Sequence, residues 1–304
     1  MRSTAAQRSL FVEAEPPVRA APRRWGAATI EYAEVRDILT RATGFMDAYD
    51  FTLNPYAGCA FACTYCYAAF FSHSTEKRDS WGRWVRVKKN AVERLAHRRG
   101  SLDGKRIYMS SVTDPYQPIE RKLGLTRKLL EMLAAKHRPK LVVQTRSPDV
   151  LRDVDLFRAL VANGGFVQVN MTVTTDDEDV RREFEPACPG NAKRLEAARG
   201  LVAAGVDTCV TMTPLLLVRN SEAFAEDLRK TGATDFIVQP FHFQRGKFVA
   251  GTRDAALGLM AEKLSTGPEE FRKRYLEHYG EVRDLLLRRL PRLGEGKHGF
   301  RPPF

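Results

Sequence analysis

Short apolar runs alternate with amphipathic stretches through most of this 304-residue chain, and that order restricts the fold more than any other feature. Six strands are predicted, at residues 51–56, 106–112, 140–145, 166–174, 207–214 and 235–240. Apolar residues at i, i+3 and i+4 predict helices between them, over residues 125–136, 150–161, 191–204 and 221–230. Each crossover returns the chain to the same edge, so the strands are expected to form a parallel sheet.

The number of strand–helix units limits the architecture further. Six units are too few for a closed eight-stranded barrel, so we expect an α/β fold with a partial (β/α)6 TIM-like barrel over residues 49–250. Residues 1–48 are rich in proline and arginine, which predicts a flexible, disordered arm with one short helix over residues 32–43. Residues 251–304 are expected to form a helical C-terminal extension.

Composition narrows the protein class. The chain is 43% hydrophobic and 28% charged, which is typical of a globular protein, and none of its apolar runs approaches the length of a membrane span. Five cysteines in 304 residues fit a reducing compartment rather than a secreted disulfide scaffold. We therefore expect a cytoplasmic protein without a membrane partner.

Three cysteines, Cys59, Cys63 and Cys66, follow the first predicted strand with the spacing C-x3-C-x2-C. A four-iron cluster takes one thiolate per iron, and ferredoxin-type proteins supply four. Three thiolates on one loop leave one iron open to a substrate or cofactor, which indicates chemistry rather than electron storage alone. The alternative is a structural zinc held by these cysteines and His73, although zinc ribbons and fingers usually contain a second pair of ligands, which this sequence lacks.

Two further motifs accompany the cysteine loop: Ser111-Val-Thr-Asp-Pro-Tyr116 after the second strand, and Phe184-Glu-Pro186 followed six residues later by Lys193-Arg-Leu-Glu-Ala197. Together the three motifs resemble the radical S-adenosylmethionine (SAM) superfamily, in the photolyase-like branch that contains spore photoproduct lyase, a DNA repair enzyme. The resemblance covers about residues 50–245. It implies a radical SAM type of partial barrel, a [4Fe–4S] cluster on Cys59, Cys63 and Cys66, and SAM bound at the open iron.

Polar residues at the predicted strand ends are the candidates for holding SAM. Its amine suits Ser110, Thr113 and Asp114, and its carboxylate suits Arg146, whose planar guanidinium matches a planar anion. Thr174 adds a donor and Tyr65 lines the adenine in the same scheme. For each of these residues a role in a turn or at a strand end remains open beside ligand contact.

The resemblance also raises the question of a hydrogen donor. Spore photoproduct lyases keep a cysteine near the end of the second strand, where alignment places Ser111 in this chain, and an alcohol O–H bond is too strong to replace a thiol. Cys188, in the loop after the fourth strand, is the alternative donor if it faces the cavity, whereas Cys209 lies mid-strand among apolar residues and is expected to belong to the core.

The net charge of +12 is concentrated in one segment, because residues 77–106 contain eleven lysines and arginines against three acidic residues. Trp81 and Trp84 lie among them, a composition that predicts a polyanion-binding face, with a merely solvated basic face as the alternative.

These observations predict a radical SAM enzyme, of lyase or transferase type, that removes a hydrogen atom from a nucleic-acid substrate. The resemblance implies a protein reductant such as flavodoxin or ferredoxin. Two alternatives stay open: radical SAM chemistry on a protein or small molecule, and a metal-stabilised nucleic-acid-binding module without catalysis.

Overall fold

The computed structural model describes residues 21–72, 74–244, 251–267 and 270–304. Its largest element is an eight-stranded sheet, parallel except at one edge. The strand order is β12 (Leu293–Glu295), β11 (Asp235–Val238), β10 (Asp207–Met212), β9 (Phe166–Thr172), β8 (Lys140–Thr145), β7 (Arg106–Met109), β4 (Phe51–Leu53) and β3 (Leu39–Arg41). The six predicted strands are all present and neighbour one another in chain order. The sheet ends at β12 and β3 without closing, which confirms the expected α/β fold with a partial barrel.

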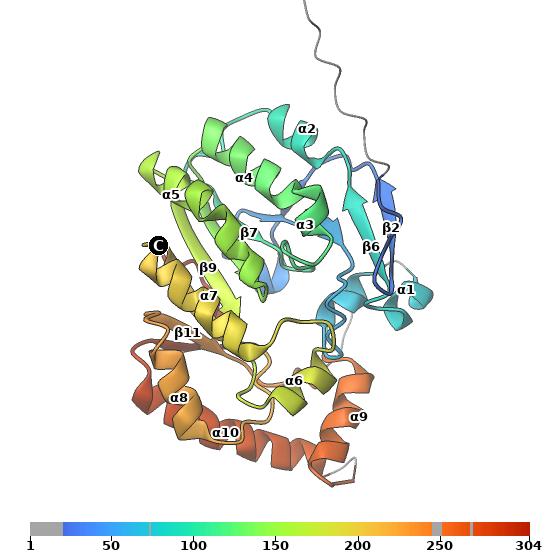
Figure 1. Cartoon of the computed structure of the whole chain (residues 1–304), viewed down its shortest axis with the longest axis vertical. Helices are drawn as coiled ribbons and strands as arrows, with labels where there is room; N and C mark the ends of the chain where they lie inside the picture. Colours follow the sequence, from blue (N-terminus) through green and yellow to red (C-terminus); the bar gives the residue numbers. More distant parts are fainter. Residues whose placement is uncertain (1–20, 73, 245–250, 268–269) are drawn as a thin grey trace, which may run out of the picture.

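Helices cover the outer face of this sheet (Figure 1). The predicted helices are α4 (Leu125–Lys136), α5 (Val154–Ala162) with the preceding 3-10 turn η3 (Pro148–Asp153), α7 (Asn191–Ala203) and α8 (Ser221–Arg229). Shorter helices lie in the connections: α1 (Thr75–Asp79), α2 (Ala91–Ala96), α3 (Glu120–Leu123), α6 (Glu178–Phe184), and the turns η1 (Gly44–Met46) and η2 (Tyr67–Phe71). Within the described residues, no helix is both long and apolar enough to cross a bilayer.

The two faces of the strands differ in polarity. In β9, Val167, Val169 and Met171 belong to the main hydrophobic core with the outer helices, while the alternate residues Gln168 and Asn170 are buried on the inner face. A parallel strand covered on both faces by core usually reads as a continuous apolar run. The alternation in β9 therefore shows that the inner face of the sheet has a polar lining.

Side chains from four strands form a hydrogen-bonded ladder on that inner face. The Tyr108 hydroxyl donates to Gln144 Oε1 over 2.7 Å, and Gln144 Nε2 donates to the hydroxyls of Thr172 and Thr211 at 2.7 and 3.0 Å. These residues lie on β7, β8, β9 and β10, and none of them is charged.

The prediction of a flexible, disordered arm is wrong for residues 21–48, while residues 1–20 lie outside the described residues. This stretch forms β3 and two strands of a second sheet, with the order β1 (Arg24–Trp25), β2 (Ala28–Ala33), β6 (Trp84–Lys88) and β5 (Tyr56–Ala57). No helix forms over residues 32–43. Ile30 and Leu39 are buried in the main core, so pairing with β6 and β4 orders a segment whose composition suggests an arm.

The C-terminal extension is mostly helical, as expected, with α9 (Asp254–Lys263), α10 (Phe271–Arg289) and α11 (Gly296–Gly299). It also supplies β12, which pairs with β11 and lengthens the sheet. Phe300 then packs against Tyr108 and Phe45 near the end of the sheet where the strands begin.

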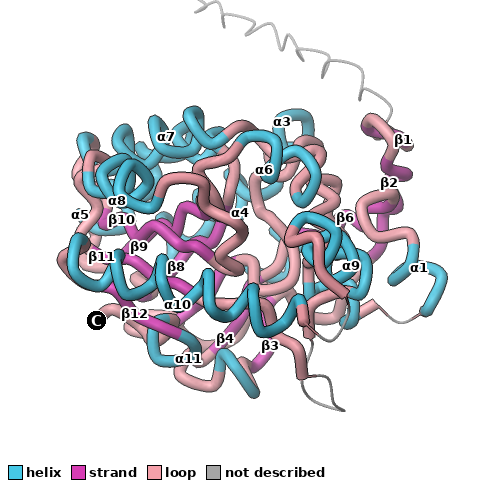
Figure 2. Tube along the Cα trace, turned by 90° about the horizontal axis from the view of Figure 1, so that it is seen from below, coloured by secondary structure: helices cyan, strands magenta, loops and turns pink. Residues whose placement is uncertain are grey.

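At the opposite end, α10 crosses the loops that follow the strands (Figure 2). The Tyr275 hydroxyl on α10 donates to the Leu215 carbonyl and accepts from the Phe241 amide, in the loops after β10 and β11.

Candidate active site

The cysteine loop lies between β5 and β6 of the four-stranded sheet, because the chain passes from β4 of the large sheet into β5 and then through Cys59, Cys63 and Cys66 into η2. Cys59 and Cys63 are buried and Cys66 is half-buried. Among the described residues, no three histidine, cysteine, aspartate or glutamate side chains converge as ligands of one metal ion. His73, which the zinc alternative needs, lies outside the described residues.

The loop has a tight and unusual backbone. Gly58 and Ala62 have φ values of 75° and 57°, a left-handed conformation that costs a residue with a side chain about 1 kcal/mol or more. A Cβ atom on Gly82 would lie only 2.3 Å from the Ala62 Cβ. The turn before Cys63 is therefore pressed directly against the backbone that leads into β6.

Two of the expected SAM contacts hold this loop and its neighbours in place. The Thr113 hydroxyl donates to the Gly58 carbonyl over 2.7 Å. Asp114 accepts from the Tyr116 amide, the Thr145 hydroxyl and the Arg146 amide at 2.8–2.9 Å. Burial raises the pKa of Asp114, and these three donors oppose that shift. Both side chains thus have partners within the protein, which is the structural role that the sequence left open.

Three other predicted residues converge on one carboxylate, that of Glu185. Glu185 Oε1 accepts from Arg146 Nη1 at 2.9 Å, from the Thr174 hydroxyl at 2.8 Å and from the Tyr65 hydroxyl. Its second oxygen accepts from Arg194, and both Glu185 and Arg194 are fully buried. Tyr65, Arg146 and Thr174 come from the cysteine loop and from the ends of β8 and β9, so the carboxylate joins three separate parts of the site.

Sequence reasoning missed Glu185 and Arg194 as functional residues, although both lie in the motifs that carry the resemblance. Burial alone would raise the pKa of Glu185, but Arg194 and Arg146 outweigh it and hold the pKa at about 2. The carboxylate is therefore ionised at neutral pH. Two arginines against one glutamate leave an excess positive charge beside the cysteine loop.

Burial and the neighbouring groups shift the pKa values of the three thiols in the loop. Burial raises the pKa of the Cys59 thiol and raises that of Cys66 to about 12. The pKa of Cys63 is lowered, first by a hydrogen bond from Cys188 and then, against burial, by the positive charge of Arg146. The hydrogen bond with Cys188, helped by Arg146, thus lowers the pKa of Cys63 and favours anionic sulfur there.

Ser110 and Gln239 carry buried polar atoms without a hydrogen-bond partner at the carboxyl ends of strands. The Ser110 hydroxyl follows β7 and the Gln239 amide nitrogen follows β11. Ser110 also has a φ of 75°, a costly conformation for a serine. Buried polar groups are nearly always paired, so an unpaired one requires an explanation such as a ligand.

The structure places Cys188 beside the loop and Cys209 away from it. The Cys188 sulfur lies 3.5 Å from the Cys63 sulfur, and both side chains are buried. Cys209 lies in β10 with 1% of its surface exposed, as expected for a core residue. The role of Cys188 as hydrogen donor remains a prediction.

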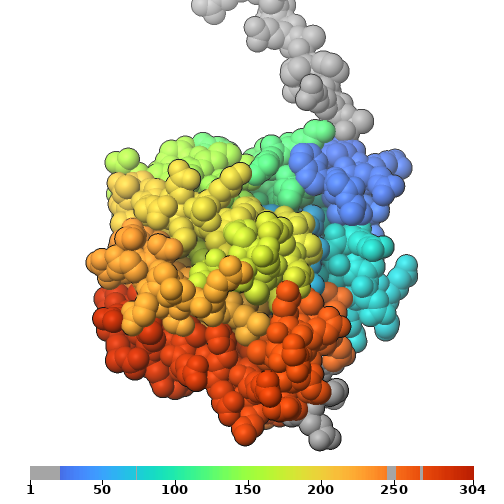
Figure 3. Space-filling model, turned by 60° about the horizontal axis from the view of Figure 1, so that its bottom comes forward, coloured from blue at the N-terminus to red at the C-terminus, as the bar shows by residue number. Residues whose placement is uncertain are grey.

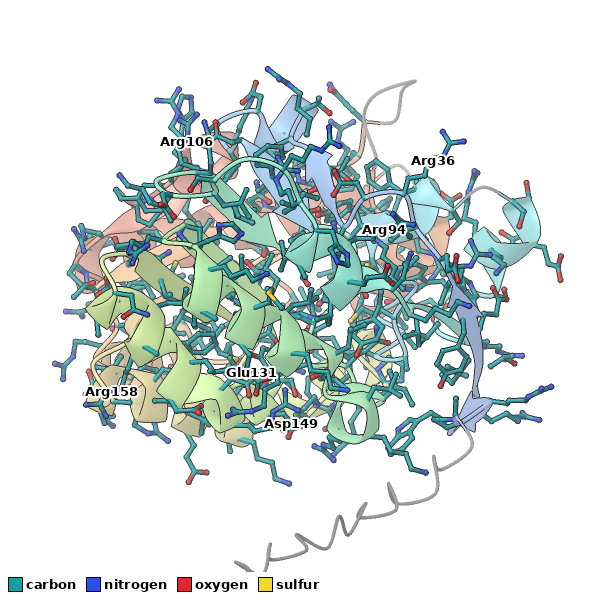
Figure 4. All side chains as sticks on the ribbon, turned by 90° about the horizontal axis from the view of Figure 1, so that it is seen from above. Arg36, Arg94, Arg106, Glu131, Asp149 and Arg158 are labelled. Carbon is teal, nitrogen blue, oxygen red and sulfur yellow. The ribbon has the colours of Figure 1, made fainter. Side chains whose placement is uncertain are left out.

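The basic segment of residues 77–106 is spread over several elements. Its α1 lies next to the cysteine loop, β6 runs from there towards α2, and Arg94 and Arg106, at α2 and the start of β7, lie on the side seen in Figure 4. Acidic residues between positions 31 and 50 pair with five of its eleven cations: Lys77 and Arg86 with Glu31, Lys89 with Glu34, Arg98 with Asp37, and Arg106 with Asp50.

Two segments that are far apart in sequence, the end of α6 and the residue before α9, contact the cysteine loop on the face that Figure 3 shows. The Thr64 amide donates to the Phe184 carbonyl at the end of α6, over 2.8 Å. Arg253, just before α9, donates to the Thr64 carbonyl over 3.4 Å. These contacts cover the loop from the solvent side.

Known proteins resemble this chain in sequence over its central part. The model of the radical SAM superfamily matches residues 53–231, more than half of the chain. An uncharacterized protein of Methanocaldococcus jannaschii is 35% identical over 166 residues, 55% of this chain and 60% of that protein. An uncharacterized protein of Mycobacterium tuberculosis is 31% identical over 176 residues, 55% of this chain and 50% of that protein. The chain thus matches about half of the length of these relatives.

Solved structures share the fold. Spore photoproduct lyase complexed with dinucleoside spore photoproduct has a TM-score of 0.50 and 17% identity, over 91% of this chain and 86% of that one. A double mutant of the same enzyme, with bound AdoMet (SAM) and the dinucleoside, has a TM-score of 0.51 at the same identity and coverage. The sequence match and the site at the strand ends agree: this chain belongs to the radical SAM superfamily, whose members bind a [4Fe–4S] cluster and SAM.

Proposed function

We propose that this protein is an enzyme that cleaves SAM reductively and removes a hydrogen atom from a nucleotide or nucleic-acid substrate. The observation that carries the proposal is the position of the three cysteines, directly beside the buried group of Glu185, Arg146 and Tyr65 at the carboxyl ends of the strands. In barrels of parallel strands, this is the end where functional residues collect.

The residues present fit the cluster and SAM. Three thiols on one short loop match a cluster with an open iron, and the excess positive charge of Arg146 and Arg194 over Glu185 suits an anionic, thiolate-bound group. The unpaired hydroxyl of Ser110 offers a contact for SAM. When bound, the cluster and SAM supply one chemistry, the reductive formation of a carbon radical that takes a hydrogen atom from the substrate.

The protein's own residues orient and shield that chemistry. We assign Cys59, Cys63 and Cys66 to the cluster and Ser110, Arg146, Thr174 and Tyr65 to the SAM site, with Thr113 and Asp114 holding the loop and the strand ends together. Glu185 fixes the guanidinium of Arg146 and the hydroxyl of Tyr65 in one orientation. The rings of Tyr65, Phe184 and Tyr275 all pack against Phe241, and this aromatic group excludes water behind Tyr65.

The inner face of the sheet supports a substrate that presents a neutral hydrogen-bonding group. Gln144, Thr172 and Thr211 form a neutral, hydrogen-bonded lining, and Gln239 adds an unpaired amide nitrogen, a surface that suits the edge of a nucleobase better than a phosphate. The structural relative that binds a dinucleoside supports the same substrate class by analogy. Because five of the eleven cations of the basic segment are paired with acidic residues, a protein or a neutral small molecule is the second candidate substrate.

The test is the formation of 5′-deoxyadenosine by anaerobically reconstituted protein with SAM and dithionite, with and without UV-irradiated DNA. We expect turnover in the wild type and in Cys209→Ala, a buried cysteine outside the loop, and only background product in Cys63→Ala. Stimulation by irradiated DNA supports the nucleic-acid substrate, and stimulation only by other compounds favours the second candidate. Zinc-loaded, colourless protein without turnover would contradict the proposal.

A further inference from the structure

Cys63 and Cys188 form the one sulfur–sulfur contact that the structure records among the described residues. Their Sγ atoms are 3.5 Å apart, and the Cys188 sulfur also lies 3.7 Å from the Phe61 carbonyl oxygen. Both side chains are more than nine-tenths buried. The two residues are 125 positions apart in sequence, so the fold, not chain proximity, brings them together.

Backbone contacts hold both sulfurs in place. On one side, the amide and hydroxyl of Thr64 both donate to the Phe184 carbonyl, at 2.8 and 3.2 Å. On the other, Arg181 Nη1 donates to the carbonyls of Glu185 and Cys188, at 3.1 and 3.0 Å. The loop of Cys63 and the loop of Cys188 are thus tied together independently of their sulfur atoms.

We propose that Cys63 and Cys188 form a disulfide when the protein carries no cluster. The two sulfurs, 3.5 Å apart in the structure, must approach to the bond length of about 2.05 Å. The thiols lose two electrons and two protons as the S–S bond forms. Dioxygen accepts them to give hydrogen peroxide, or a low-molecular-weight disulfide accepts them to give two thiols.

This bond would control assembly of the site. A sulfur atom in a disulfide cannot serve as a thiolate ligand, so Cys63 becomes available to iron only after a dithiol has reduced the bond. The same bond protects Cys63 from over-oxidation to sulfinic acid, which is irreversible for most proteins. The disulfide therefore withholds one of the three cluster ligands reversibly, until it is reduced.

The experiment begins with the full chain, stripped of metal with a chelator and exposed to air. Thiols are counted under denaturing conditions before and after treatment with a dithiol reductant. All five cysteines are free in the structure, so we expect three thiols in the oxidised protein and five after reduction. Cys188→Ser should keep four thiols in both states, while Cys209→Ser should have two thiols when oxidised and four after reduction.

Peptide mapping identifies the bond. Chymotrypsin cuts after Phe61, Tyr65 and Tyr67, so each loop cysteine falls on a different peptide, with Cys63 on residues 62–65 and Cys188 on residues 185–195. We expect these two peptides to be linked without reductant. A thiol count that stays at five, or a link that joins Cys59 or Cys66 instead, would overturn the proposal. Neither readout depends on SAM cleavage, so this test and that of the proposed function can fail separately.

Discussion

A Glu185→Gln variant is expected to lose about 3–5 kcal/mol of unfolding free energy, the usual cost of removing one partner of a buried ion pair. Glu185 lies between Arg194, which is fully buried, and Arg146, whose side chain is 15% exposed. Glutamine has nearly the same shape but no charge, so both guanidinium groups lose their counterion inside the protein. Chemical denaturation of the two proteins at neutral pH measures the difference.

Glu183→Gln is the matched control, because it makes the same change two residues away. Glu183 pairs with Lys263 at the surface, with 38% of its side chain exposed, so its loss should cost no more than about 1 kcal/mol. Equal effects of the two variants would contradict a central role for Glu185. If Glu185→Gln does not fold, Thr174→Val removes one donor to the carboxylate and should cost about 1 kcal/mol.

The pH dependence of stability follows from the same carboxylate. The pKa of Glu185 is depressed to about 2 from an ordinary value of 4.5, so its contribution is fully present above pH 4.5 and is lost as the pH falls through 2. The full contribution is about 3 kcal/mol, since each pKa unit corresponds to about 1.4 kcal/mol. The stability difference between wild type and Glu185→Gln should therefore shrink by about 2 kcal/mol between about pH 7 and pH 3. A constant difference would show that Glu185 does not titrate as the structure requires.

The fold could be predicted where its signals are local. The helix Leu125–Lys136 and the strand Lys140–Thr145 begin and end at the predicted residues, because apolar spacing and turn residues lie within each segment. The strands β2 and β3 could not be predicted in this way. Their order depends on pairing with β6 and β4, and a short segment gives no sign in its own sequence of such a distant partner.

The same division holds for the site. The spacing of the three cysteines identifies them within one loop. The role of Glu185, in contrast, depends on partners from β8, β9, α7 and the cysteine loop, which only the folded chain brings together. Counting charges along residues 77–106 overstates their free positive charge for a related reason, because it omits acids elsewhere in the chain, such as Glu31 and Asp50. One usable signal was present: the alternation of valine with glutamine and asparagine in β9 already indicates a polar inner face.

A Gly82→Ala variant is expected to lose most of its capacity to hold the cluster, although Gly82 is not a ligand. Its Cβ atom would lie 2.3 Å from the Ala62 Cβ and 2.9 Å from the Ala62 Cα, directly before Cys63 in the loop. Overpacking of this kind costs about 1–3 kcal/mol, and the φ of +94° adds backbone strain of about 1 kcal/mol or more. We expect the loop to move away from β6, with iron and sulfide per protein reduced several-fold after anaerobic reconstitution.

Two further variants separate the effect of the contact between positions 82 and 62 from the backbone strain of a positive φ. Gly100→Ala introduces the same side chain at a φ of +84° with no atom within 4 Å, so it shares the strain without the clash and should load iron as the wild type does. The double variant Gly82→Ala/Ala62→Gly removes the closest contact, and glycine also suits the φ of 57° at position 62, so iron loading should recover. If Gly82→Ala and Gly100→Ala load iron equally, or the double variant brings no recovery, the contact with Gly82 does not position the cysteine loop. Recovery would show that the close contact between Gly82 and Ala62, within the connection from β5 to β6, helps the three thiols to set the shape of the cluster site.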